Sequence, residues 1–355
     1  EKEMYTFDDR GGNSLTLVPE GTASVCRAYL EHGLHNLQQP VKLYYYSSIF
    51  RYERPQAGRY RQHHQFGCEA IGSDDPALDA EVIEMAWWFF NSLNLTQTSL
   101  QVNSIGCRKC RPGYLAKLTE YYNGHLGKLC GDCRDRLLKN PLRLLDCKKT
   151  SCQPVAEAAP KNAEHLCSEC AEHFSYLKKY LDLLGIPFLL NHRLVRGLDY
   201  YTRTVFELQP KLEGSQSALG GGGRYDDLIE SLGGKPTPAI GFATGMERII
   251  LNLREQNTSI PELPGAEVYI AHLGNDAGDV AIKLASQLRQ NGFAVIEAIG
   301  NKSLKAQLKQ AGNIGVHYAL IIGDDEVRAG TVMLRDMLNA QQQSVSIDKL
   351  PELLK

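Results

Sequence analysis

The first hundred residues alternate two kinds of apolar pattern: short runs typical of β-strands and longer runs with the period of an α-helix. The predicted strands are 15–18, 41–50, a run that begins at Gly67, and 101–105, and the predicted helices are 22–32 and 76–93. The second helix carries four consecutive aromatic residues, 87–90, which we expect to pack in a core.

A cysteine-rich, mostly helical segment follows, and the strand pattern then returns. We predict a strand at 202–208, a glycine run at 220–223, and a strand, glycine turn and helix over 239–253. Two prolines and few apolar residues mark 257–264 as a linker.

Beyond the linker the pattern is that of a small α/β domain with a partly parallel sheet. Its predicted strands are 267–273, 294–298, 319–323, 331–334 and 344–347, and its predicted helices are 278–291, 304–312 and a short one at the end. Nothing in it looks catalytic. The chain is therefore predicted to hold a mixed α/β domain at 1–260, with an insertion at about 107–180, and a second domain at 266–355.

Composition adds mainly exclusions. The 355 residues carry a net charge of −2, and no apolar run approaches the roughly 18 residues of a membrane helix. Charge is uneven, however, because 107–180 holds 14 Lys and Arg against 8 Asp and Glu, a net +6. Such a segment is a candidate surface for a polyanion, although a basic helical face is more often only solvated.

Eight of the ten cysteines lie in close pairs within that basic segment. The pairs are Cys107 with Cys110, Cys130 with Cys133, Cys147 with Cys152, and Cys167 with Cys170. These spacings let two thiolates reach one tetrahedral metal ion, which indicates structural zinc. Redox-active or simply reduced cysteines are the alternatives. Cys26 and Cys68 stand alone and are expected to be buried.

The most informative segment is FRYERPQAGRYRQHHQFGCE at 50–69. A turn with Pro55 and Gly58 separates two strand patterns, so an antiparallel hairpin should project Arg51, Arg54, Arg59 and Arg61. Guanidinium groups keep their charge and offer paired donors to phosphate oxygens. Taken alone, the hairpin could equally be a solvated basic loop.

Three other segments share this chemistry. VPEGT at 18–22 places a carboxylate and a hydroxyl group where a helix should begin. LVRGLDYY at 194–201 brings together an arginine, an aspartate and two tyrosines. GMER at 245–248 puts an arginine in the first turn of a helix. Together with the glycine run, they indicate a site for a triphosphate and a small polar or amine-bearing substrate.

These motifs resemble those of the histidyl-tRNA synthetases, which are class II aminoacyl-tRNA synthetases, in their bacterial form. The 50–69 segment is similar to class II motif 2, AIGFATGMERIIL to motif 3, and LVRGLDYYTRTVFE to the signature of the histidine enzymes. The resemblance implies a class II catalytic domain, with an antiparallel sheet flanked by helices, and a C-terminal α/β anticodon-binding domain. Motif 1, which builds the class II dimer interface, is expected upstream of Glu1, so a natural N-terminus is expected to have been lost.

The resemblance also implies a role for each residue of the site. The proposed histidine-binding residues are Glu20, Thr22 and Gln65 at the α-amino group, Glu69 and Tyr201 at the imidazole, and Tyr200 and Tyr225 beside them. The proposed ATP-binding residues are Arg51 on the α-phosphate, Arg59 and Arg248 on the outer phosphates, and Glu53 on the adenine side. Arg196 would lie between the substrate carboxylate and the α-phosphate, which makes Arg196 and Arg51 the predicted catalytic residues. Val18 and His63 depart from the usual residues of the family without touching this set.

The implied reaction joins L-histidine to tRNA-His through an adenylate, with ATP as substrate, Mg²⁺ on its phosphates, a homodimeric enzyme and a cytoplasmic location. The insertion is expected to face the tRNA acceptor arm. Two alternatives stay open at this point. One is a non-catalytic relative such as the regulatory subunit of ATP phosphoribosyltransferase, which should have lost ATP arginines and the C-terminal domain, and the other is a zinc-dependent RNA-binding module.

Overall fold

The computed structural model describes residues 4–53, 58–211, 218–258, 264–300 and 302–354. It divides the chain into two compact units, Glu1–Ser259 and Ile260–Lys355. Arg54, Pro55 and most of the predicted linker lie outside the described residues.

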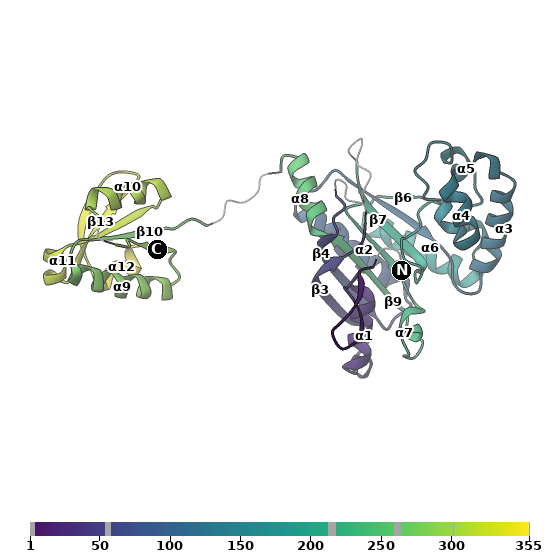
Figure 1. The fold of residues 1–355 in the computed structure, drawn as a ribbon, viewed down its shortest axis with the longest axis horizontal. Helices are drawn as coiled ribbons and strands as arrows, with labels where there is room; N and C mark the ends of the chain where they lie inside the picture. Colours follow the sequence, from purple (N-terminus) through teal and green to yellow (C-terminus); the bar gives the residue numbers. More distant parts are fainter. Residues whose placement is uncertain (1–3, 54–57, 212–217, 259–263, 301, 355) are drawn as a thin grey trace. The chain divides into compact units, whose positions relative to one another are not determined.

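A seven-stranded sheet forms the centre of the first unit (Figure 1). Its order is β3 (Val41–Phe50), β4 (Gln62–Ile71), β9 (Ala239–Gly245), β8 (Gly220–Arg224), β7 (Thr202–Pro210), β5 (Thr98–Ser104) and β6 (Phe188–Leu190). All neighbours are antiparallel except β5 and β6. The predicted antiparallel sheet and hairpin are therefore confirmed. The strand predicted at 15–18 is the short β2 (Ser14–Thr16), which pairs only with β1 (Thr6–Asp8) among the described residues.

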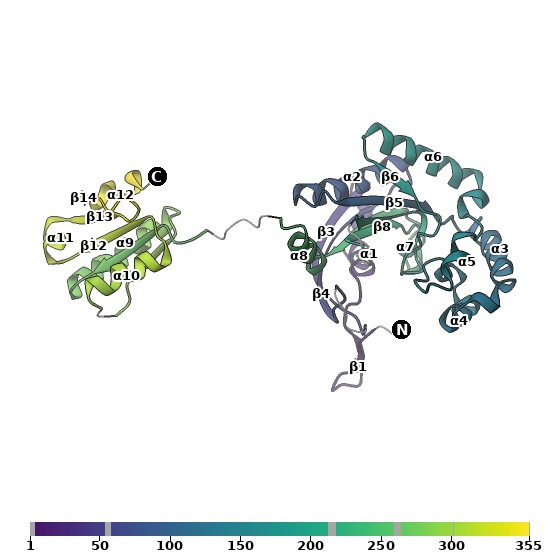
Figure 2. The same cartoon turned by 90° about the horizontal axis from the view of Figure 1, so that it is seen from above.

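The two faces of this sheet differ. Helices α2 (Pro76–Ser92) and α6 (Ser168–Leu183) lie side by side on one face (Figure 2). Along β4, Phe66, Cys68 and Ala70 join the hydrophobic core beneath them. Because neighbouring strand residues point to opposite faces, Gln65, Gly67 and Glu69 face away from that core. The smaller helices are α1 (Thr22–Glu31), α7 (Leu228–Ser231) and α8 (Met246–Glu255).

The aromatic run of α2 is only partly in the core, so its prediction was wrong for one residue. Phe90 is fully buried, whereas Trp88 is 61% exposed. Consecutive residues of an α-helix point about 100° apart, so four in a row cannot all face one side.

The glycine run forms strand β8, which the sequence pattern did not predict. Glycine is a poor strand former because it has no side chain to pack. Here the missing side chain is required, since a Cβ on Gly222 would stand 1.9 Å from the carbonyl oxygen of Gly241 on β9.

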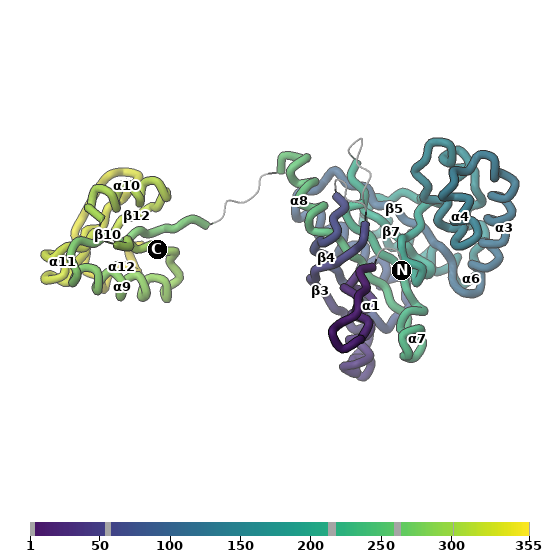
Figure 3. Tube along the Cα trace, in the orientation of Figure 1, coloured from purple at the N-terminus to yellow at the C-terminus, as the bar shows by residue number. Residues whose placement is uncertain are grey.

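The cysteine-rich insertion connects β5 to β6 and is mostly helical, as predicted. Its helices are α3 (Arg111–Asn123), α4 (Gly131–Lys139), α5 (Gln153–Glu157) and the start of α6, with short 3-10 turns between them. In Figure 3 the chain leaves the sheet, forms a compact group of helices beside it, and returns to the sheet, where β6 pairs with β5. Its core includes Leu194, Val195, Tyr201 and Val205, so the insertion packs directly on the LVRGLDYY segment.

The second unit has a five-stranded sheet that is partly parallel, as predicted. The order is β11 (Val295–Glu297), β10 (Val268–His272), β12 (Tyr318–Ile322), β13 (Thr331–Asp336) and β14 (Gln342–Ser346), with the first two pairs parallel. Its helices are α9 (Asn275–Gln290), α10 (Leu304–Ile314), α11 (Asp324–Ala329) and α12 (Leu350–Leu353). Helix α11 was not predicted, because six mostly charged residues carry no apolar period. Across the described residues of the chain, no helix combines the length and the apolarity that crossing a membrane requires.

A buried ion pair joins α2 to the end of β8. Asp79 and Arg224 are both fully buried, with Arg224 Nη2 2.7 Å from Asp79 Oδ1. Arg224 also donates to the carbonyl oxygens of Ser73 and Asp75. The guanidinium thus ties the strand that precedes Tyr225 to the start of α2.

Removing Asp79 should leave the buried guanidinium of Arg224 with Asp226, 3.1 Å from its Nη1, as its remaining carboxylate partner. We expect Asp79→Ala to lower the free energy of unfolding by about 3–5 kcal/mol, as measured by urea denaturation. Glu81→Ala, which breaks the exposed pair between Glu81 and Lys42, is the control and should cost about 0–1 kcal/mol. Similar losses in the two variants would contradict a structural role for the buried pair.

Candidate active site

A buried carboxyl group lies at the centre of the candidate site. Glu69, on β4, is only 2% exposed. Its Oε1 accepts a hydrogen bond from Thr22 Oγ1 at 2.7 Å, and its Oε2 accepts one from the Tyr225 hydroxyl at 2.6 Å. Three predicted histidine-binding residues, far apart in sequence, are therefore in direct contact.

The surroundings of Glu69 change its acidity. Burial raises the pKa of its carboxyl group from 4.5 to about 8, although the hydrogen bonds from Tyr225 and Thr22 act in the opposite direction. The backbone of β9 comes very close, because a Cβ on Gly241 would stand 1.7 Å from Glu69 Oε2. Only glycine fits opposite this carboxyl group.

Glu20 occupies the N-terminus of α1. Its carboxylate accepts hydrogen bonds from the backbone N–H groups of Thr22 and Ala23, at 3.0 and 2.8 Å, and one from the Tyr200 hydroxyl at 3.0 Å. A carboxylate that satisfies free N–H groups at a helix start is held firmly. The VPEGT segment therefore opens a helix, as predicted, and fixes Glu20 and Thr22 toward the same region.

Tyr45, on β3, completes this part of the site and was missed from the sequence. Its hydroxyl donates to Gln65 Oε1 at 3.4 Å. Its ring fills the space beside two glycines, since a Cβ on Gly21 or Gly67 would stand 2.2 or 2.4 Å from ring atoms. Gly67 lies in the segment quoted for the resemblance, but a lone tyrosine in a strand gave no signal of its own.

The arginines form a second group at the turn end of the hairpin. Arg51 Nε donates to the Pro19 carbonyl oxygen at 2.7 Å, and Arg248 donates to the carbonyl oxygens of Gly58 and Ala218 at 2.9 and 3.1 Å. Burial lowers the pKa of Arg248, and the charges of Arg59 and Arg51 lower it further. Arg59 and Arg51 are thus close enough to Arg248 for their charges to repel its guanidinium group, which favours an anion beside Arg248.

Glu53 balances part of this charge, with its carboxylate 3.8 Å from Arg59 Nη1. The predicted ATP-binding residues are thus gathered in one place. His64, on the neighbouring strand, is hydrogen-bonded to Glu247 through both its backbone N–H and its ring, which joins the hairpin to the start of α8.

Arg196, in the LVRGLDYY segment, lies against β7 and β8, with its Nη1 beside Gly221. It forms an ion pair with Glu207 on β7, and its guanidinium carbon lies 5.8 Å from the centre of the Tyr201 ring. Glu207 was missed from the sequence, although it ends the quoted LVRGLDYYTRTVFE motif. Tyr200 packs against Tyr201 and Tyr225, with ring centres 4.9 and 5.9 Å apart, so the three tyrosines form one wall.

The four cysteine pairs combine into two clusters of four. Cys107, Cys110, Cys167 and Cys170 form one, and Cys130, Cys133, Cys147 and Cys152 form the other, with the sulfur atoms of each within 4.8 Å of one another. Each cluster therefore offers a complete set of ligands for one tetrahedral metal ion. Cys26 and Cys68 are buried, as predicted.

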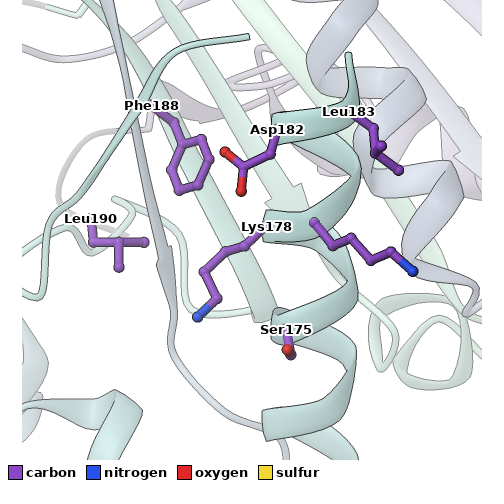
Figure 4. Close-up of a pocket in the computed structure, with 7 residues that line it drawn as sticks. Ser175, Lys178, Asp182, Leu183, Phe188 and Leu190 are labelled. Carbon is purple, nitrogen blue, oxygen red and sulfur yellow. The ribbon is translucent and has the colours of Figure 1, made fainter. Parts of the chain in front are cut away.

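A separate pocket lies between α6 and β6 and contains none of the predicted site residues. Figure 4 shows Ser175, Lys178 and Asp182 along the helix, with Phe188 and Leu190 opposite. Flexible lysine stems and exposed leucines line it, so we assign it no chemistry.

The buried Glu69 generates a prediction on pH. Its raised pKa means that the folded protein holds a proton that the unfolded chain releases, so this contribution to stability is complete below pH 4.5 and lost as the pH rises through about 8. We expect Glu69→Gln to flatten the decline of the unfolding free energy between about pH 5 and 9, measured by urea denaturation at each pH. Glu81→Gln, at an exposed site, should keep the parent slope. If the decline is unchanged in Glu69→Gln, the buried proton is not at Glu69.

Comparison with known proteins agrees with this geometry. The family model described as histidyl-tRNA synthetase matches residues 1–109 and 138–249, and the one described as anticodon binding domain matches 267–355. A histidine–tRNA ligase of Dehalococcoides mccartyi is 59% identical over 98% of this chain and 84% of its own length. One of Desulforamulus reducens is 50% identical over 100% and 85%.

Among solved structures, the apo histidyl-tRNA synthetase of S. aureus is 37% identical, with a TM-score of 0.83 over 99% of this chain and 86% of its own. A Bacillus halodurans protein titled an ATP phosphoribosyltransferase regulatory subunit/histidyl-tRNA synthetase is 22% identical, with a TM-score of 0.62 over 91% of this chain and 84% of its own, which shows the fold alone. The fold, the gathered motif residues and the curated relatives lead to one conclusion: this chain belongs to the histidyl-tRNA synthetase family.

Proposed function

We propose that the chain activates L-histidine with ATP and transfers the histidyl group to tRNA-His. The observation that carries this proposal is that the buried carboxyl group of Glu69 belongs to the same hairpin as Arg51 and Arg59, whose charges act on Arg248. One half suits an amino acid with two ring nitrogens, and the other suits a triphosphate. The 50–59% identity to histidine–tRNA ligases over nearly the whole chain supports the same activity.

In the first step the carboxylate of histidine attacks the α-phosphorus of ATP, and pyrophosphate leaves. A carboxylate is already a nucleophile at neutral pH, so the protein needs to supply alignment and charge neutralisation. Arg51 is proposed to hold the α-phosphate, Arg59 and Arg248 the outer phosphates, and Arg196 the attacking carboxylate and the phosphorus centre. In the second step the terminal ribose 3′-hydroxyl of tRNA attacks the adenylate carbonyl, and AMP leaves.

Selection of histidine is proposed to depend on Glu69 and the tyrosine wall. Once it has given up its proton, the Glu69 carboxylate has about four lone-pair sites, and Thr22 and Tyr225 take two, so a ring N–H of the substrate can bind without displacing either. Tyr201 would face the other ring nitrogen. Glu20, Thr22 and Gln65 would receive the α-ammonium, for which the carboxylate of Glu20 supplies the opposite charge.

Mg²⁺ is proposed to accompany ATP, bound mainly by phosphate oxygens. Burial lowers the pKa of Arg248, while the negative charges of Glu53 and Glu207 act to raise it. Glu53 pairs with Arg59 and Glu207 pairs with Arg196, so these two carboxylates lie among the arginines and are the candidates to hold the ion. The ion would neutralise charge on the phosphates.

The non-catalytic alternative is not favoured. A relative that had lost the reaction should have lost ATP arginines and the C-terminal domain, yet Arg51, Arg196 and Arg248 are present and 267–355 matches the anticodon-binding model. A zinc-dependent RNA-binding module would explain the cysteines but not the buried carboxyl group or the arginines.

Arg196→Ala should abolish histidine-dependent exchange of pyrophosphate into ATP while leaving the fold intact. The side chain would contribute mainly to the transition state, so we expect kcat to fall at least about 100-fold. Arg254→Ala, at an exposed position of α8, is the control and should keep the parent rate. Near-normal exchange in Arg196→Ala, with an unchanged circular dichroism spectrum, would contradict the proposed role of Arg196 at the attacking carboxylate and the α-phosphorus.

The partners are proposed from the family. A homodimer is proposed because class II motif 1 builds a dimer interface. The insertion is proposed to contact the acceptor arm of tRNA-His through its net charge of +6. Lys148 and Lys149 are exposed there and follow Cys147 directly, so they are suited to phosphate contacts.

Reversing these two charges tests the RNA contact. We expect Lys148→Glu with Lys149→Glu to weaken tRNA binding and to reduce the slope of log affinity against log salt by about one for each lost contact. Lys235→Glu, exposed on a loop of the catalytic unit, should leave both quantities unchanged. Pyrophosphate exchange should persist in the double variant, because it requires no tRNA. An unchanged salt slope would place the RNA elsewhere.

A further inference from the structure

The cysteines of the insertion are arranged as two complete, separate sites. The first site joins Cys107 and Cys110, just before α3, to Cys167 and Cys170, at the start of α6. The residues of each contact, Cys107 with Cys167 and Cys110 with Cys170, are 60 positions apart in the sequence. The second joins Cys130 and Cys133 to Cys147 and Cys152. In both, two close pairs meet, although the sequence did not show which pairs belong together.

The spacing of the sulfur atoms fits a tetrahedral metal ion. Neighbouring sulfurs are 3.8–3.9 Å apart in the first cluster, and Cys130 and Cys147 are 3.9 Å apart in the second. Four sulfurs about 2.3 Å from one zinc ion would be about 3.8 Å from one another. A disulfide would bring two sulfurs to about 2.05 Å and leave the others apart.

Backbone donors also point at the sulfur atoms. The N–H of Cys107 donates to Cys110 Sγ at 3.3 Å, that of Lys109 to Cys107 Sγ at 3.4 Å, and that of Cys130 to Cys152 Sγ at 3.2 Å. Such donors stabilise negative sulfur, which is the form that binds zinc.

We propose that each cluster binds one Zn²⁺, two per chain, and that the two ions hold the insertion against the segment 193–201 so that Arg196 is correctly placed. On binding, four thiols lose their protons and form four Zn–S bonds, with no change of oxidation state. The family match leaves out residues 110–137, so three of the eight ligands, Cys110, Cys130 and Cys133, lie outside the matched part of the chain.

The first cluster acts through Arg111, the residue that follows Cys110. Its guanidinium donates to the carbonyl oxygens of Ile105 and Gly106, at 3.2 and 3.0 Å, and to that of Tyr201 at 2.6 Å. A metal that fixes Cys110 therefore fixes the donor that holds the end of the LVRGLDYY segment.

The second cluster acts through the segment between Cys133 and Cys147, which contains the rest of α4 and a 3-10 helix at Pro141–Leu144. Asn140 donates to Asp199 Oδ1 at 2.8 Å, and Arg143 donates to the Gly197 carbonyl oxygen. From the other side, Arg193 donates to the Leu145 carbonyl oxygen at 3.2 Å. The backbone on both sides of Arg196 is thus held by residues whose own positions depend on the cysteines.

The first half of the test counts metal and is independent of enzymatic activity. Full-length protein purified under reducing conditions with zinc should hold two Zn²⁺ per chain by mass spectrometry of the metal. Cys110→Ser with Cys167→Ser should hold one, as should Cys133→Ser with Cys147→Ser, and Cys68→Ala should keep two. Cobalt in place of zinc should give the absorption of a tetrahedral thiolate complex. Fewer than two zinc ions per chain in the parent protein, or disulfides among the eight cysteines, would overturn the proposal.

The second half measures positioning and rests on the proposed function. Loss of the second cluster should lower kcat/KM for histidine in pyrophosphate exchange by about 10- to 100-fold, with a smaller change in the KM for ATP. Asn140→Ala with Arg143→Ala should reproduce this defect while keeping two zinc ions, which separates positioning from folding. Unchanged histidine kinetics in that variant would refute the coupling. An inactive parent protein that still holds two zinc ions would refute the proposed function alone.

Discussion

The candidate site is organised by one costly feature, a carboxyl group buried in the middle of a sheet face. Transfer of Glu69 out of water is tolerated because two hydroxyl groups donate to it and because its pKa is raised, so that it holds a proton near neutral pH. Its two partners come from the start of α1 and the end of β8. Their positions depend in turn on the glycine backbone of β8 and β9, which leaves no room for a Cβ beside the carboxyl oxygen.

The arginine group differs from Glu69, because its members keep their charge. Like charges at short range raise the free energy of the empty site, and backbone carbonyl oxygens offset only part of this. Arg51 and Arg248 use the carbonyls of Pro19, Gly58 and Ala218 to hold their guanidinium groups without cancelling their charge. A polyphosphate would relieve the repulsion, so the site is built to favour the ligand that it is proposed to bind.

The local sequence determined much of this arrangement and left out the contacts that depend on the fold. The hairpin of β3 and β4, the start of α1 and the helix that begins within GMER were predicted, because strand alternation, a carboxylate before a helix and a glycine turn are local signals. Strand β8 was not, since its pairing is a property of the neighbouring strands. Tyr45 and Glu207 were missed for a related reason, because each became part of the site only when another segment packed beside it, the start of α1 beside Tyr45 and the LVRGLDYY segment beside Glu207.

The same distinction applies to the insertion. Its basic charge and cysteine spacing could be read from the sequence and suggested an appendage for RNA, yet its hydrophobic core includes Leu194, Val195 and Tyr201 of the catalytic unit. The segment around Arg196 is neither helix nor strand, so its backbone groups need partners, and the insertion residues Arg111 and Arg143 donate to two of its carbonyl oxygens, those of Tyr201 and Gly197. Deleting the insertion would therefore remove part of the support of the active site together with any RNA surface. Surface charge changes can separate these two roles, because they leave the shared core in place.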